Sequence, residues 1–298
     1  MKLLVQIAIG CLMLFLIGCL QQELTPTPDQ NTRSCLIRQV DSYDVQGGNW
    51  SLRSQVFDYN KAGDPIRQTF IDSKRNITKI ITIEYDGLRP TRINQYEGEA
   101  ETPANLTMYK TLVISANYDV IIDHTFERRD NNQYAETVTL AKQFFRNQAG
   151  ALKLRRTDFV TPAATPDSIG TRLGTYWRNE YDAKNENVVQ RFFKQADWAQ
   201  EQVQYTQGGF DMNGRSPWNA SLWLAYTRSL GPDFRTGEGF WSENNIALQA
   251  GGTGQTTFFY NYEINSAGFP CVGYVKRADN VVEPGQSYYY YYNCPCSR

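Results

Sequence analysis

The sequence lacks the features on which several large classes of protein depend. It contains a single histidine, His124, and its formal net charge is −1. Lysine and arginine are spread along the chain and form no basic stripe, so a nucleic acid partner is not expected. After the first 17 residues no apolar run is long enough to cross a membrane as a helix. These absences argue against a nucleic acid-binding protein and against further membrane-spanning helices.

Common catalytic and cofactor motifs are missing as well. His124 follows Asp123 in an expected strand, but no Gly-x-Ser-x-Gly motif accompanies them, so an ordinary strand histidine is a better interpretation than a catalytic one. The 31 Asp and Glu residues show no spacing that marks the carboxylate pair of a glycosidase. We therefore predict no cofactor, no metal and no catalytic residue. A hydrolase directed at carbohydrate or peptide, with an unrecognised carboxylate site, is the alternative.

What the chain does have begins with an export signal. A basic start (Met1-Lys2) precedes an almost unbroken apolar run from Leu3 to Ile17, as in a secretory signal peptide. The run ends in Leu-Ile-Gly-Cys at residues 16–19, which resembles the lipobox of bacterial lipoproteins. That resemblance implies cleavage after residue 18 and a lipid anchor, such as palmitate, on Cys19.

Two alternatives exist for this segment. Cys11 also follows small and aliphatic residues, but cleavage there would leave apolar residues at the start of the mature chain. An uncleaved membrane helix is the other alternative, although a plain span has no use for the final cysteine. Residues 19–34 are polar and contain two prolines. We expect them to be a flexible tether that could hold a domain roughly 45 Å from the membrane.

Residues 35–298 are predicted to form one all-β domain. Short runs rich in β-branched and aromatic residues alternate with turn residues about every 8–12 positions, which is typical of antiparallel hairpins. We expect an antiparallel β-meander of many hairpins, arranged as a single large twisted sheet or a sandwich. One short helix is predicted near 216–230, because Ser216-Pro217 is a helix-start signal and Gly231-Pro232 ends it.

The four cysteines of this domain are predicted to form disulfides. Cysteines in an exported protein are paired by default, and four of them allow three pairings. A zinc site is the alternative, but Cys-Pro-Cys is tighter than the usual ligand spacing. Cys294 and Cys296 are too close in sequence to pair without strain. We expect one of them to bond Cys35 and the other Cys271.

A weak internal repeat recurs along the chain. Its copies span 57–66, 83–91 and 260–270, with a fainter copy at 179–187. Each copy is a strand that ends in an aromatic residue, followed by a polar turn and a new strand that proline often opens. These hairpins resemble those of lipoproteins of unknown function common in Bacteroidota. The resemblance also includes the lipobox, the polar tether, the opening at 35–40, the stretch around Trp218, the segment 242–246, the hairpin at 268–270 and the closing segment 290–294.

The hairpins are also similar to YD (RHS-type) repeats. The resemblance implies a lipid-anchored protein of the cell envelope, at the outer membrane, and brings no agreed activity. It leaves open whether the domain faces the periplasm or the cell surface. Cys296 lies beyond the usual closing cysteine and departs from the pattern. In addition, Asp167-Ser168-Ile169 resembles the O-glycosylation site of these bacteria.

Aromatic residues are the most suggestive feature for function. Aromatic residues make up 13% of the chain, and five of the six tryptophans lie between residues 177 and 241. Exposed tryptophan on a rigid sheet can stack on a sugar or a peptide side chain. Packing in the core is the alternative. Trp198, in a polar run, is the first candidate for ligand stacking, with Trp177 and Trp241. We predict a non-enzymatic protein that binds a glycan or peptide or supports the envelope structurally.

Overall fold

The computed structural model describes residues 35–46, 49–167, 169, 172–184, 186–207, 209–216, 244–246, 248–251, 257–266, 268–277 and 282–294. These residues form strands joined by turns, and the predicted helix near 216–230 lies outside them except for Ser216. No helix of the described part is long and apolar enough to span a membrane. The strands are β1 (Ile37–Gln46), β2 (Asn49–Tyr59), β3 (Pro65–Ile71), β4 (Ile77–Asp86), β5 (Arg89–Glu97), β6 (Leu106–Ile114), β7 (Val120–Arg128), β8 (Tyr134–Arg146), β9 (Leu152–Val160), β10 (Arg172–Tyr181), β11 (Val188–Lys194), β12 (Gln202–Gln207), β13 (Phe210–Arg215), β14 (Asn244–Ile246), β15 (Leu248–Gly251), β16 (Thr257–Ile264), β17 (Pro270–Arg277) and β18 (Val282–Tyr292).

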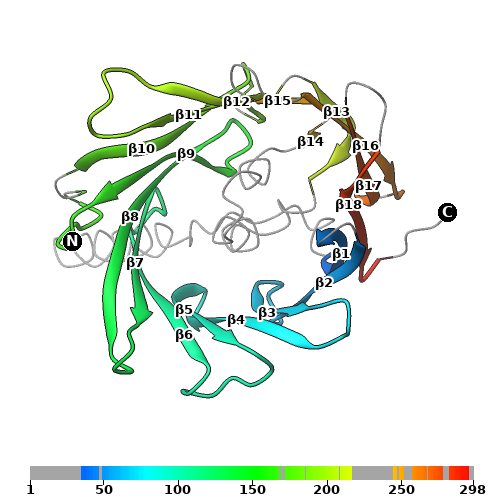
Figure 1. The fold of residues 1–298 in the computed structure, drawn as a ribbon. Helices are drawn as coiled ribbons and strands as arrows, with labels where there is room; N and C mark the ends of the chain where they lie inside the picture. The colour runs from blue at the N-terminus through cyan, green and yellow to red at the C-terminus, as the bar shows by residue number, and fades with distance from the viewer. Residues whose placement is uncertain are drawn as a thin grey trace, which may run out of the picture.

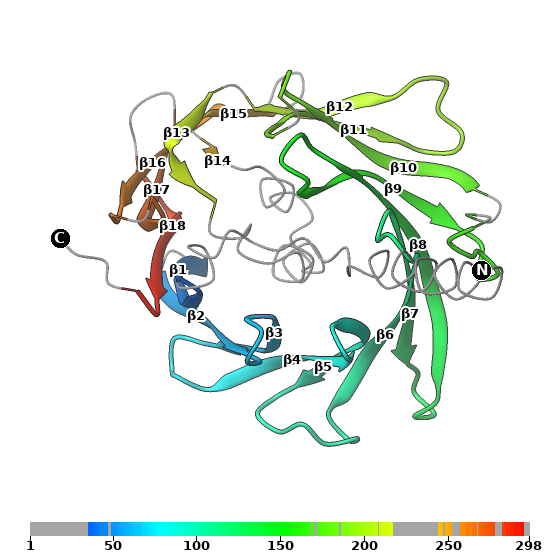
Figure 2. The ribbon, with the colours of Figure 1, turned by 180° about the vertical axis from the view of Figure 1, so that it is seen from behind.

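Strands β1 to β12 and β15 to β18 form one closed barrel (Figure 1). Neighbouring strands are consecutive in sequence except where β12 pairs with β15 and β1 with β18, and β13 and β14 form a small separate sheet. The ring closes where β1 pairs with β18, as the reverse view in Figure 2 also shows. The predicted antiparallel meander is confirmed. Of the two expected arrangements, a single large sheet is the one found, and its closure leaves no unpaired edge.

The same type of turn connects the two strands in each of five hairpins. The N–H of its first residue donates to the carbonyl four residues later, and its carbonyl accepts from the N–H three residues later. That fourth residue has a positive φ. The same conformation is found in three-residue hairpin loops, in which a type I turn is followed by one residue in the left-handed region. The first residues are Asn60, Asp72, Arg129, Asn147 and Asn265, and the fourth are Gly63, Arg75, Asn132, Gly150 and Gly268. This geometry explains why Asn, Asp and Gly recur between the strand segments of the sequence.

Tyrosines near the strand ends bind the backbone of neighbouring strands. The hydroxyl of Tyr59 donates to the Ile37 carbonyl over 2.6 Å, and that of Tyr85 donates to the Pro65 carbonyl over 2.8 Å. Tyr181 makes an equivalent bond, over 2.8 Å, to a carbonyl of β9. Burial raises the pKa of Tyr59 and Tyr85, so both phenols stay protonated donors. The aromatic residue that ends three copies of the sequence repeat therefore joins adjacent strands through a side-chain hydrogen bond.

The register divides the barrel wall into two faces, because directly opposed residues of antiparallel strands share a face. On one face, Lys142, Thr157, Trp177 and Phe193 lie opposite one another across β8 to β11. We call this the aromatic face. On the other, His124 lies opposite Thr111 of β6 and Thr139 of β8, and we call this the polar face.

Each face has its own packing. The largest buried apolar cluster joins residues of β4 to β9 and β11 with the turn residue Tyr118. By register, its strand residues Ile81, Ile93 and Ile121 lie on the aromatic face. On the polar face, residues of β7 to β9 pack against Ala164 of the loop that follows β9. Both faces therefore hold buried side chains that fix the strands.

Candidate functional site

Four aromatic rings form a continuous row on the aromatic face. Phe159 of β9 lies 5.4 Å from Trp177 of β10, and Trp177 stacks on Phe193 of β11 with 5.2 Å between ring centroids and 28° between planes. Trp198, in the turn after β11, meets Phe193 edge-on at 5.4 Å. All four side chains are half-buried. We call them the aromatic row.

The row brings together two of the three predicted stacking residues. Trp177 and Trp198 contact the same phenylalanine, Phe193, whereas Trp241 lies outside the described residues. Their half-buried state falls between the exposed platform and the buried core that the sequence left open. Phe159 and Phe193 were not predicted, although both lie in strands whose register places them beside Trp177. Ligand binding by these tryptophans stays a prediction.

A charged group lies on the same face as the aromatic row. The Lys142 ammonium donates to Asp123 over 2.8 Å, and both side chains are almost fully buried. Lys110, on the neighbouring strand β6, is 8% exposed. The pKa of Lys110 is lowered to about 8, mainly by burial and also by the charge of Lys142, while Asp123 and Glu127 oppose the shift. We call Lys110, Asp123 and Lys142 the buried charge cluster.

The lone histidine lies on the polar face. His124 Nδ1 is 2.8 Å from Glu136, and the Thr139 hydroxyl donates to the same carboxylate oxygen over 2.7 Å. Burial favours a raised pKa for Glu136, but the hydrogen bonds from Thr139 and His124 outweigh it and lower the pKa. Asp123 lies on the opposite face, because adjacent residues of a strand alternate. A Ser-His-Asp arrangement that uses Asp123 is therefore excluded.

Two further ion pairs fix the polar face. Asp158 is 1% exposed and accepts hydrogen bonds from Arg156 and Gln143. Glu201 accepts from Arg178 through two guanidinium nitrogens, at 3.1 and 2.7 Å. The hydrogen bond from Arg178 lowers the pKa of Glu201. Each of these two carboxylates thus has an arginine as its ion-pair partner.

The carboxyl groups of the described residues can be compared with those that a glycosidase uses. A glycosidase needs a carboxylic acid whose pKa is raised, beside a second carboxylate. Among the described residues, the carboxyl groups with a shifted pKa are Asp72, Asp119, Glu136 and Glu201, and in each the shift is downward. In the described ranges no cluster of three or more His, Cys, Asp or Glu could hold a metal ion.

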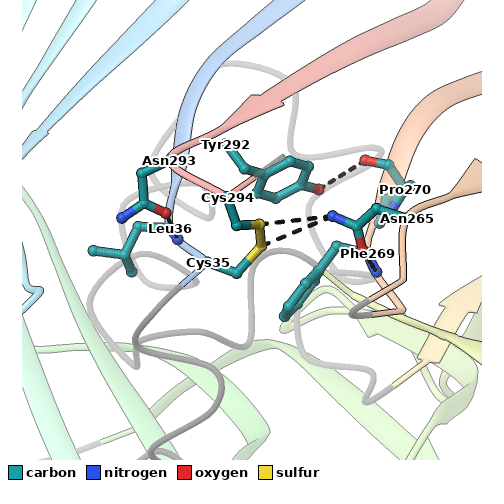
Figure 3. Close-up of a disulfide and its surroundings, with 8 residues drawn as sticks. All are labelled: Cys35, Leu36, Asn265, Phe269, Pro270, Tyr292, Asn293 and Cys294. Atoms are coloured by element: carbon teal, nitrogen blue, oxygen red, sulfur yellow. Dashed lines mark hydrogen bonds between the residues drawn. A yellow bond between two sulfur atoms is a disulfide. The ribbon is translucent and has the colours of Figure 1, made fainter. Parts of the chain in front are cut away.

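A disulfide joins the start of the domain to its tail. Cys35 is bonded to Cys294, with 5.0 Å between their Cα atoms (Figure 3). The Asn265 amide lies 3.9 and 3.7 Å from the two sulfurs. The predicted link between Cys35 and the tail is confirmed. Cys271 is also disulfide-bonded, and because Cys294 is taken, its predicted partner is Cys296, which lies outside the described residues.

The remaining predicted positions lie outside the described part of the chain. These are the lipidation site Cys19 and the O-glycosylation candidate Ser168. The boundaries at residues 18 and 34 also fall there. Beside Ser168, Ile169 packs against the small apolar cluster of the polar face. The lipid anchor, the tether and the modification stay predictions.

Comparison with known proteins shows likeness in fold alone. No protein-family model matches the chain, and no curated protein matches it in sequence. A porin-like protein from Bacteroides uniformis has a similar structure, with a TM-score of 0.52 and 10% identity over 85% of this chain and 95% of that chain. A porin-like protein from Bacteroides vulgatus covers 87% of this chain and 98% of its own, at 12% identity and a TM-score of 0.38. The first likeness shows that the barrel is a known fold.

Proposed function

We propose that this protein is a lipid-anchored barrel of the cell envelope that binds a glycan through the aromatic row. The observation that carries the proposal is the chain of contacts from Phe159 through Trp177 and Phe193 to Trp198. Aromatic rings offer a large rigid surface for the apolar faces of sugar rings. Three of these rings stand on adjacent strands, so little conformational entropy is lost when a ligand binds.

Charged residues on both faces favour a position in water. A barrel embedded in lipid presents an apolar band to the bilayer, and each Arg or Lys at the midplane costs roughly 2–4 kcal/mol. Lys110 stands at the middle of β6 on the aromatic face, and Arg156 at the middle of β9 on the polar face. Whichever face points outward, one of these two mid-strand cations would belong to the wall that faces lipid. A barrel outside the bilayer avoids this cost.

The lipid on Cys19 would then be the link to the membrane. Replacing Cys19 by Ser should abolish labelling with palmitate and leave the precursor with its signal peptide attached. Labelling of the Cys19→Ser variant would overturn the anchor while leaving the glycan proposal intact.

A glycan array tests the binding function. The full chain should bind at least one class of oligosaccharide, and Trp198→Ala should weaken that binding about tenfold or more, as expected for an aromatic contact at a hot spot. The melting temperature of the variant should stay close to that of the parent, because Trp198 lies in a turn and is half-buried. Binding to peptides but not to glycans would contradict the ligand class. A structural role in the envelope follows if the intact protein binds neither.

A further inference from the structure

Within the described part of the chain, the buried charge cluster contains two lysines and one carboxylate. Asp123 is bonded to Lys142 and is fully buried. Within the part of the chain that the structure describes, the Lys110 ammonium makes no hydrogen bond or ion pair, although its side chain is 8% exposed. A buried charge is normally paired, because its removal from water costs free energy. No carboxylate of the described residues is therefore bonded to the Lys110 ammonium.

The ionisable groups near Lys110 do not neutralise the charge of its ammonium. Among the described residues, Asp123, Lys142 and Glu127 are the charged groups whose fields reach Lys110. Asp123 already holds Lys142, and burial still lowers the pKa of Lys110 to about 8 despite the two carboxylates. Directly across the strand pairs, Lys110 faces the apolar Ile93 on one side and Thr125 on the other. An anion brought from outside would supply the missing charge.

The cluster and the aromatic row lie on one face within reach of one ligand. Lys142 of β8 is opposite Thr157 of β9, which is opposite Trp177 of β10. Strands are about 4.8 Å apart, so Lys142 and Trp177 are separated by about 10 Å across the strands, and Lys110 and Trp177 by about 19 Å across the strands plus an offset along them. A chain of several sugar rings covers such a span.

We propose that the glycan bound by this barrel is acidic, with sugar rings stacked on the aromatic row and a carboxylate bound to Lys110. The ligand class is an oligosaccharide that contains uronic acid. This inference rests on the proposed function, since the row supplies the stacking surface. Lys110 supplies a charge-assisted hydrogen bond that a neutral sugar does not receive.

The test compares two ligands that differ only in charge. One is an oligomer of galacturonic acid, and the other is the same oligomer with its carboxyl groups reduced to primary alcohols. Calorimetric titration of the full chain should give at least about tenfold tighter binding to the acidic oligomer. Equal affinity for both would overturn the inference and leave the proposed function standing. Binding to neither oligomer, in a protein that binds no other glycan, would overturn the proposed function itself.

Two lysine variants locate the effect. Lys110→Met should remove the preference for the acidic oligomer and leave the affinity for the neutral one unchanged. Lys79→Met is the matched control, because Lys79 lies on the same face, is partly buried and contacts the Phe70 ring at 4.3 Å. It should keep the preference. Loss of the preference in Lys79→Met alone would place the anion elsewhere and overturn the inference.

The pH dependence of the unmodified protein provides a measurement that needs no variant. The preference for the acidic oligomer should fall as the pH rises through the pKa of Lys110, about 8, because the ammonium loses its proton there. Binding of the neutral oligomer should not change over the same range. An unchanged preference well above that pH would exclude Lys110 as the carboxylate ligand.

Discussion

Cys35 and Cys294 are bonded to each other although 259 residues separate them in sequence. The bond lies where β1 and β18 close the barrel, and Leu36 and Asn293 extend the pairing beside it. The Leu36 N–H donates to the Asn293 side chain over 2.6 Å, and the Asn293 N–H donates to the Leu36 carbonyl over 3.0 Å. Covalent and hydrogen bonds thus join the two ends of the sheet.

Removing this disulfide should destabilise the barrel substantially. In the chain-entropy model, a loop of this length restricts the unfolded chain by up to about 5 kcal/mol. The double variant Cys35→Ser/Cys294→Ser leaves no unpaired thiol at the site. We expect its denaturant midpoint, followed by circular dichroism, to fall clearly below that of the parent. An unchanged midpoint would show that the hydrogen bonds of the β1–β18 seam suffice without the bond.

The recurrent turn gives a second prediction. Gly150 adopts φ of +82°, and a Cβ added there would meet no atom within 4 Å. Any cost of Gly150→Ala therefore comes from backbone strain, and we expect about 1 kcal/mol of lost stability. Gly150→Asn should cost less, because Asn occupies the same position at residue 132 of an equivalent turn. Equal losses for both variants would contradict the strain explanation.

The pKa of Glu136 leads to a prediction about pH. Hydrogen bonds from Thr139 and His124 lower the pKa of Glu136 below its ordinary value of 4.5. The ionised carboxylate therefore stabilises the fold at a pH above 4.5. This contribution is lost as the pH falls through the lowered value. Glu136→Gln should therefore lose less stability than the parent when the pH is taken from neutral to below that range. Parallel pH profiles of unfolding free energy would show that the pair contributes nothing.

Much of the fold could be predicted from local sequence. Alternating residues in strands and the Asn, Asp and Gly residues of the turns predicted the meander, since both patterns depend on neighbouring residues alone. Closure of the barrel could not be predicted, because it depends on the pairing of Val40 with Tyr290 at the far end of the chain. The Cys35 disulfide was the one sequence feature that pointed to this contact.

The candidate site was predicted only in part. Trp177 and Trp198 stood out by residue type, but Phe159 and Phe193 joined them only once the register was known. Bulges, such as that between Gln143 and Phe144, shift the alternation so that faces cannot be traced along the sequence. The buried charge cluster was not predicted either. Asp123 and Lys142 are 19 residues apart and lie on different strands, so they meet only when β7 pairs with β8.

Two neighbouring phenylalanines of β11 test the central claim most directly. Phe193 belongs to the aromatic row, whereas Phe192 points to the polar face under the Arg178 guanidinium, and both are half-buried. Calorimetric titration with the glycan identified on the array should show about tenfold or greater weakening for Phe193→Ala, equal to about 1.4 kcal/mol or more. Phe192→Ala should bind as the parent does. Equal affinity of the two variants would contradict a binding site on the aromatic row.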